Sequence, residues 1–173
     1  MEYWLYNKQV LSSILPKDYP IDAIHDELTL QRQHESALKF TAQTFLGQLE
    51  MDLHSTFDPN GDTSILQFKT ERAKIYSPHD IPEKSDLSSL YSIFQANADG
   101  NHVSSYRYLW SEVLSADAYQ KFQECDDMEK VGRQFRDSVL RVGGSISARE
   151  SFHHFRGRDA TMNALLQYHG LFQ

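Results

Sequence analysis

Apolar residues recur every three or four positions along much of this chain, which is the period of an α-helix. In the first half the repeat is formed by five residues, Leu38, Ala42, Phe45, Leu49 and Leu53. Proline, which breaks helices, is absent after Pro82. Alternation of apolar and polar residues, the pattern of a half-buried strand, is weak throughout the chain. The sequence therefore predicts an all-α protein built as a helical bundle.

The second half of the chain predicts several helices in succession. A broad buried face is expected from apolar residues at helical spacing, namely Tyr106, Leu109, Trp110, Val113 and Leu114. A shorter helix that contains Val131 and Leu140 is expected to end at Gly143 and Gly144, because glycine adopts the left-handed conformation that closes a helix.

Helix-end signals divide the last thirty residues of the chain. Ser147 and Glu150 form a capping box, which predicts the start of a helix that ends near Gly157. Asp159 is expected to cap a last helix over residues 160–168.

We expect a single domain over residues 1–173. Its parts are N-terminal helices over 1–57, a loop-rich connection over 58–84 and C-terminal helices over 85–173. Residues 24–57 fit one helix-length stretch, which the turn residues 58–62 end. The short run Ile65–Phe68 is the best strand candidate.

Charge and composition exclude two classes of partner. The chain has 17 Lys+Arg against 24 Asp+Glu, a net charge of −7, with no basic cluster to neutralise nucleic-acid phosphates. No window approaches the roughly 18 apolar residues of a membrane-spanning helix, and the first residues do not form a secretory signal.

The single Cys125 favours a reducing compartment, so we expect a cytoplasmic protein.

Metal-binding patterns fail at the required spacing. The only His-Glu pair is His34-Glu35, and the position that a zinc-peptidase helix fills with the second His is Leu38. His153 and His154 are adjacent, so on a helix they point about 100° apart and do not share a face. We therefore expect no metal and no catalytic residue in this chain.

Five sequence blocks nevertheless occur in an order and at a spacing that are typical of one protein family. They are Tyr106–Phe122, Gly132–Arg136, Val139–Ser145, Phe155–Asp159 and Leu165–Leu171. Together they resemble the carboxyl-terminal end of the thimet oligopeptidase and oligopeptidase A family of zinc peptidases. The resemblance extends more loosely to the whole chain through Met1–Trp4 and Gln48–Glu50.

The resemblance implies a mostly helical fold like the C-terminal part of the family's catalytic domain. Family members cleave short peptides in a channel between two lobes, with zinc held by a His-Glu-x-x-His helix and a downstream Glu. If Met1 aligns just before the family's Glu-Asn-Trp segment, all three zinc ligands precede residue 1. The family uses zinc, whereas this chain is expected to hold no cofactor.

The family's substrate loop falls inside the matched region. In a comparison without gaps, Gln95 stands at the position of the family's His and Asp99 at that of its first Gly. Asn101 and Ser105 stand at two of its Tyr positions. Tyr108, Tyr106 and Gly100 match the family and are the candidate vestigial substrate-binding residues. Packing in the helix is the better interpretation for Tyr106, while both a site role and a core role stay open for Tyr108.

Two hypotheses for function follow, and whether the chain is an enzyme stays open. The first is a non-catalytic, degenerate relative that binds a protein partner, itself or a peptide through the surface that the missing lobe would cover. The alternative is the C-terminal piece of a split zinc metallo-oligopeptidase, active only with an upstream zinc-bearing polypeptide. A decayed gene product that keeps only the fold is a third possibility.

Overall fold

The computed structural model describes residues 2–77, 88–98, 100 and 103–172. Within these ranges the chain is helical and contains no strand, which confirms the all-α prediction. The chain forms two compact units, the first made of Met1–Ser36 with Ser111–Gln173 and the second of Ala37–Trp110. The expectation of a single domain stays a prediction.

The first unit contains most of the helices. They are the 3₁₀-helix η1 (Glu2–Tyr6), α1 (Lys8–Ile14), α2 (Ile21–Gln33), most of α6 (Tyr106–Gln123), α7 (Met128–Phe135), the π-helix η2 (Arg136–Leu140), α8 (Ala148–Arg156) and α9 (Asn163–Tyr168). The second unit contains α3 (Ser36–Ser55) apart from its first residue, α4 (Ile65–Tyr76), α5 (Ser88–Ala98) and the first five residues of α6.

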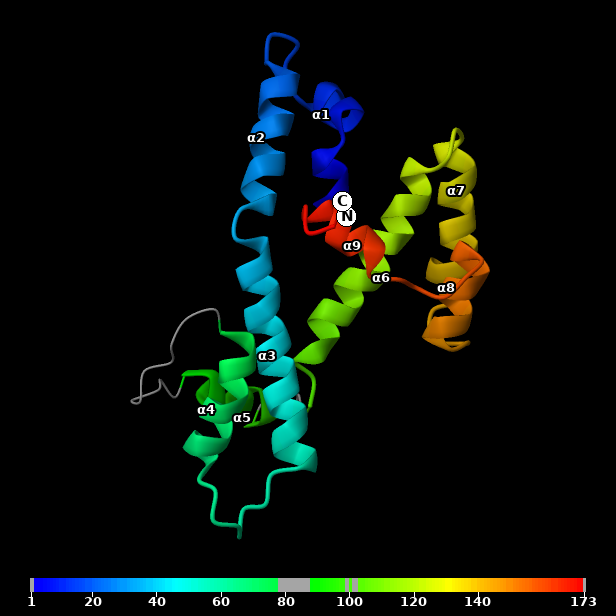
Figure 1. The fold of residues 1–173 in the computed structure, drawn as a ribbon. Coiled ribbons are helices and arrows are strands. Elements are labelled where there is room, and N and C mark those ends of the chain that lie inside the picture. The colour runs from blue at the N-terminus through cyan, green and yellow to red at the C-terminus, as the bar shows by residue number, and fades with distance from the viewer. Residues whose placement is uncertain (1, 78–87, 99, 101–102, 173) are drawn as a thin grey trace. The chain divides into compact units, whose positions relative to one another are not determined.

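Aromatic contacts join the two ends of the chain in the first unit. The Tyr3 ring lies 4.5 Å from that of Tyr168 and 5.3 Å from that of Tyr119, centroid to centroid. The Trp4 ring packs edge-on against Tyr119 and Phe122 of α6. As a result η1 and α9 lie side by side against α6 (Figure 1).

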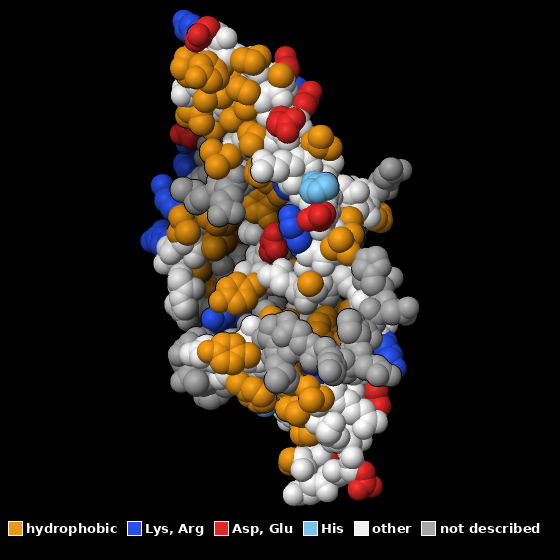
Figure 2. All heavy atoms as spheres, turned by 90° about the vertical axis from the view of Figure 1, so that its left-hand side faces the viewer, with side chains coloured by type: hydrophobic (Ala, Val, Ile, Leu, Met, Phe, Trp, Pro, Cys, Tyr) orange, Lys and Arg blue, Asp and Glu red, His pale blue; other side chains and the backbone are white. Residues whose placement is uncertain are grey.

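Apolar side chains are also exposed on the first unit, over α1 and α2. No residue of α2 is fully buried, and Ile14, Tyr19 and Leu30 are each at least half exposed. Figure 2 shows hydrophobic side chains gathered over these two helices, near the top of that view. Among the described residues no helix combines the length and the apolar content needed to cross a membrane.

The second unit has its own core. Leu49, Phe68, Leu90 and Ile93 are buried together, and they come from α3, α4 and α5. Of the predicted stripe on residues 38–53, Leu49 is fully buried and Phe45 and Leu53 pack against this cluster, whereas Leu38 is half exposed.

The predicted helix-length stretch over 24–57 is interrupted. α2 ends at Gln33 and α3 begins at Ser36, because Glu35 has a left-handed backbone with φ 57°. The Ser36 hydroxyl donates a hydrogen bond to the His169 carbonyl at 3.1 Å, which ties the start of α3 to the end of α9. The helical spacing of apolar residues over 24–57 does not predict this tertiary contact.

The strand candidate Ile65–Phe68 is wrong, since these residues form the first turn of α4. The Ser64 hydroxyl accepts the Gln67 N–H at 3.2 Å and so caps the helix. A side-chain cap and burial of Phe68 outweigh the weak strand preference of four residues. The predicted connection over 58–84 thus contains a helix, and its end, from residue 78, lies outside the described residues.

The start of α8 is confirmed, because Ser147 is its N-cap and the Ser147 hydroxyl accepts the Glu150 N–H at 3.1 Å. α8 ends at Gly157, as predicted, and this glycine has the left-handed backbone of a helix cap, with φ 78°. Asp159 does not cap the last helix, which begins later, at Asn163. Its carboxylate instead accepts two hydrogen bonds from the Arg149 guanidinium, at 3.0 and 2.6 Å.

Candidate functional site

The predicted site tyrosines lie in the first turn of α6. Tyr106 is 53% and Tyr108 is 60% exposed, and Trp110 one turn later is 54% exposed. The expectation that Tyr106 and Trp110 belong to a buried face is therefore wrong. Tyr108 is not a core residue either. The buried side chains of α6 form a narrower stripe that includes Val113, Ala116 and Asp117. The five apolar residues of the predicted face span more of the helix surface than the neighbouring helices cover.

Tyr106 and Tyr108 do not point the same way. Residues two apart on an α-helix are rotated by about 200°, so their rings leave opposite sides of the helix. Tyr106 and Trp110 are four residues apart and share a side. We name Tyr106, Arg107, Tyr108 and Trp110 the α6 aromatic surface, which extends around the helix from one side to the opposite one.

The start of α6 is anchored on α3. Glu50 is 1% exposed, and its Oε2 accepts the backbone N–H of Ser105 at 2.8 Å. A carboxylate at this place satisfies a free helix N–H and interacts favourably with the helix dipole. A Cβ on Gly47 would lie 3.4 Å from the backbone N and Cα of Tyr106, an ordinary van der Waals distance, so the two helices pack closely here.

The segment before α6 adopts strained backbone. Val103 has φ 47°, which is unfavourable for a β-branched side chain. Gly100 has φ 80° and is exposed, and a Cβ there would meet nothing within 4 Å, so its conformation rather than crowding favours glycine. Asp99 and Asn101, two of the predicted replacements in the family's loop, lie outside the described residues.

A cation accompanies Tyr108. The Arg107 Nη2 lies 3.5 Å from the Tyr108 hydroxyl as a donor, and its guanidinium carbon is 5.2 Å from the ring centroid. The α6 aromatic surface therefore offers hydroxyl donors, ring faces and a positive charge on one rigid helix end.

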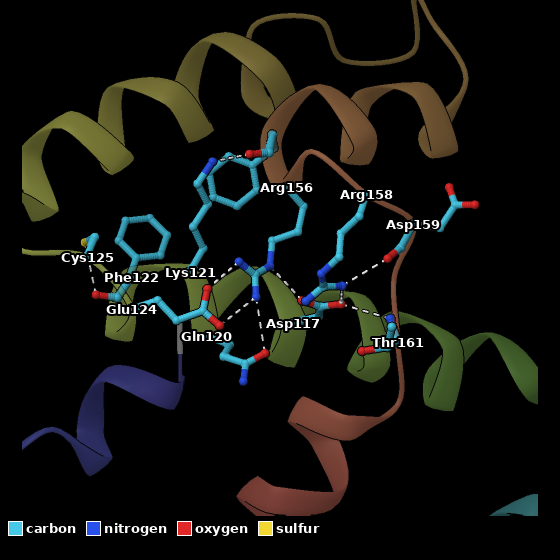
Figure 3. Close-up of polar contacts among 11 residues, drawn as sticks. Asp117, Gln120, Lys121, Phe122, Glu124, Cys125, Arg156, Arg158, Asp159 and Thr161 are labelled. Carbon is cyan, nitrogen blue, oxygen red and sulfur yellow. Dashed lines mark hydrogen bonds and ion pairs between the residues drawn. The ribbon is translucent and has the colours of Figure 1, made fainter.

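A second cluster, in the first unit, centres on a buried carboxylate (Figure 3). Asp117 of α6 is 0% exposed and accepts four hydrogen bonds. Arg156 Nε binds Oδ1 at 2.7 Å, Arg158 binds both oxygens at 2.6 and 2.7 Å, and the Thr161 N–H binds Oδ2 at 2.9 Å. Burial raises the pKa of Asp117, but these hydrogen bonds outweigh burial and hold the pKa below its ordinary value.

Arg156 extends this cluster along α6. Its guanidinium also donates to both oxygens of Glu124, at 2.6 and 3.1 Å, and to the side-chain amide oxygen of Gln120 at 3.2 Å. Lys121 donates to the Phe155 carbonyl, so the same helix also binds the backbone at the end of α8. The cluster thus fastens residues 155–161 to α6, and its acceptor oxygens on Asp117 are saturated. We interpret it as structural.

Comparison with known proteins identifies the family of this chain. The model of Peptidase family M3 matches residues 1–171. The chain belongs to this family. Oligopeptidase A of Salmonella typhimurium is 30% identical over 182 residues, which cover 99% of this chain and 26% of the relative. Organellar oligopeptidase A of Arabidopsis thaliana is 31% identical, with 99% and 22% covered. Saccharolysin of Saccharomyces cerevisiae is 28% identical. The chain spans about a quarter of the length of these relatives.

The M3 family is a family of zinc metallopeptidases. In the described part of this chain, no three His, Cys, Asp or Glu side chains gather so that they could hold a metal. His34 pairs with Glu35 at 3.6 Å, and His153 and His154 are exposed on α8. Within the described residues of this M3 member, the histidines and carboxylates are therefore not grouped as zinc ligands would be.

Sequence reasoning found the tyrosines but missed Asp117 and Glu50. Both are acidic residues at positions where the helical spacing places buried side chains: Asp117 stands one turn after Val113, and Glu50 three residues before Leu53. A carboxylate on the apolar side of a helix is the signal that could have found them, because a buried charge requires partners.

Proposed function

We propose that this chain is a non-catalytic member of the M3 family that binds peptide segments at the α6 aromatic surface. The observation that carries the proposal is the exposure of three aromatic rings within five residues, beside Arg107. Tyr, Trp and Arg are the residue types that contribute most binding energy at protein interfaces.

Anchoring of α6 supports the same function. Because Glu50 binds the Ser105 N–H, the start of the helix is held on α3, next to Gly47, and its side chains are presented from a fixed backbone. A preorganised surface pays less ordering entropy when it binds. The Tyr108 hydroxyl would donate to a peptide carbonyl on one side of the helix, and the Tyr106 and Trp110 rings would cover apolar side chains of the peptide on the opposite side.

The non-catalytic part of the proposal rests on the sequence. Gln95 and Ser105 stand where the family pattern that this chain resembles has a His and a Tyr. An oxyanion-stabilising donor of this kind is typically worth about 10²–10³ in rate, so its loss removes much of the chemistry while leaving a binding surface.

The test is a titration of the ¹⁵N-labelled chain with an end-blocked, alanine-based octapeptide that contains one Leu and one Phe, followed by NMR. We expect saturable shifts confined to the first turns of α6, and about tenfold weaker binding for Tyr108→Ala. Tyr91→Ala removes another exposed tyrosine, on α5, and serves as the matched control that leaves binding unchanged. Equal losses in the two variants, or shifts elsewhere only, would contradict the proposal.

A second candidate is supported by the length comparison. The match covers 22–26% of the oligopeptidase A relatives. The rest of such a protein would pack against the exposed apolar side chains of this chain. In this candidate the chain works with a polypeptide that supplies the zinc ligands, and the pair hydrolyses peptides.

Mixing separates the two candidates. The chain is combined with the complementary part of Salmonella oligopeptidase A and zinc, and octapeptide cleavage is followed by mass spectrometry. Zinc-dependent cleavage that requires both polypeptides supports the second candidate. Peptide binding by the chain alone, without cleavage in the mixture, supports the first.

Analytical ultracentrifugation of the chain alone tests self-association, which the first candidate allows through the apolar side chains of α1 and α2.

A further inference from the structure

The first unit contains a cavity of about 260 Å³ between α6, α9 and the N-terminal helices. It is lined by three tyrosines, three glutamines, two alanines and one arginine, namely Tyr3, Tyr119, Tyr168, Gln120, Gln123, Gln167, Ala116, Ala164 and Arg32. The volume is many times the roughly 30 Å³ share of a water molecule and slightly below that of drug-sized pockets. It suits a ligand with few heavy atoms.

Of the described residues that line the cavity, Arg32 alone carries a charge. It lies in the last turn of α2, with its guanidinium carbon 3.7 Å from the Tyr168 ring centroid and 4.4 Å from that of Tyr6. Its Nε is buried and has no hydrogen-bond partner, and no carboxylate of the described residues pairs with it. A half-buried guanidinium held between two rings thus keeps an unused N–H donor.

The phenols around Arg32 do not supply a negative charge. Burial raises the pKa of Tyr168 well above its ordinary value, although Arg32 itself acts in the opposite direction. Burial likewise raises the pKa of Tyr119. Both phenols are therefore neutral at physiological pH, and among the described residues the charge of Arg32 meets the Tyr6 and Tyr168 rings and the Tyr168 hydroxyl rather than a carboxylate.

A second donor faces the same space. The Gln120 side-chain oxygen accepts a hydrogen bond from Arg156, so the amide nitrogen is the polar atom of Gln120 left for a ligand. Donors combined with an uncompensated cation select an anion, and a planar guanidinium fits a carboxylate best because it can donate two parallel hydrogen bonds.

We propose that this cavity binds the carboxylate group of a small organic acid or of a peptide's C-terminal residue, with Arg32 as the counter-ion. The site lies wholly within the first unit and is independent of the α6 aromatic surface, which belongs to the second unit. The end-blocked peptide used to test that surface has no terminal carboxylate, so either proposal can fail alone.

The experiment titrates the intact chain with two carboxylate probes, propionate and glycylglycine, and with their neutral-end counterparts, propionamide and glycylglycinamide. NMR follows the Arg32 Nε–H and the backbone amides of α2 and α9. We expect saturable shifts at these groups with at least one carboxylate probe and none with the amides. Binding of both probes assigns the site to carboxylates in general, and binding of glycylglycine alone assigns it to peptide termini.

Variants at Arg32 test the counter-ion. We expect Arg32→Met to weaken binding by about tenfold or more, and Arg32→Lys to weaken it less, because lysine keeps the charge but loses the planar donor pair. Arg133→Met removes an exposed arginine of the same unit, on α7, and leaves binding unchanged. If Arg32→Met does not fold, Arg32→Lys and the amide probes still decide the matter. The proposal is overturned by equal shifts with acids and amides, by unchanged affinity in the Arg32 variants, or by shifts that appear only away from the cavity.

Discussion

Replacing Asp117 tests whether the buried cluster holds the first unit together. Asp117→Ala removes a fully buried carboxylate and the four hydrogen bonds that it accepts, three of them from guanidinium groups. Breaking a buried ion pair by deleting one partner typically costs about 3–5 kcal/mol, because the other charge stays buried without compensation.

The partners that remain place the expected loss at the lower end of that range. The Arg156 side chain is only 6% exposed, but it keeps its hydrogen bonds to Glu124 and Gln120. The Arg158 side chain is 40% exposed and can turn toward water. We therefore expect a loss of about 3 kcal/mol in the free energy of unfolding, a large fraction of the 5–15 kcal/mol of a typical domain.

Urea unfolding followed by Trp4 fluorescence measures this loss, because Trp4 packs on Tyr119 and Phe122 in the same unit. Trp110, the other tryptophan, is replaced by Phe in both proteins so that the signal reports the first unit. Asp22→Asn removes a solvent-exposed carboxylate that pairs with Lys8 and is the matched control, for which we expect little change. A loss for Asp117→Ala below about 1 kcal/mol, the value of an exposed pair, would refute the assignment of a structural role.

Three further predictions concern acid and local backbone. The folded pKa values of Asp117 and Glu124 are lowered, so their stabilisation is fully present above the ordinary values of 3.8 and 4.5 and is lost as the pH falls through the folded values. The free energies of unfolding of wild type and Asp117→Ala, measured during acid titration, should therefore converge in that pH range, and a difference that widens would contradict this. Ser147→Ala should cost about 1 kcal/mol by removing the α8 cap, with faster amide exchange at Glu150, whereas unchanged exchange would argue against the cap. Val103→Gly should stabilise the second unit by about 1 kcal/mol, since relief of a left-handed β-branched residue exceeds the entropy cost of glycine, and a lower urea midpoint would speak against strain.

Helix ends set by neighbouring residues could be predicted from the sequence. Ser147, Glu150 and Gly157 act within one or two turns of each other, so their pattern alone indicated where α8 begins and ends. The break at Glu35 could not be predicted in this way, because it is stabilised by Ser36 binding the His169 carbonyl 133 residues away. The strand candidate at Ile65–Phe68 failed since four residues carry too little periodicity to outweigh the cap at Ser64.

The same limit applies to the sites. Resemblance identified Tyr106 and Tyr108, but their exposure depends on how far neighbouring helices cover α6, which spacing does not report. Asp117 meets Arg156 and Arg158 39 and 41 residues later in the chain. Arg32 reaches Tyr168 only because η1, α2 and α9 are brought together in the first unit. Long-range pairs of this kind require the tertiary structure.

The titration of the ¹⁵N-labelled chain with the end-blocked octapeptide, with zinc present, tests the central claim most directly. Binding by a non-catalytic member of the M3 family predicts saturable shifts in the first turns of α6, with the peptide intact at the end of the titration. Cleavage of the peptide by the chain alone, or no saturable shift in those turns, would contradict the claim.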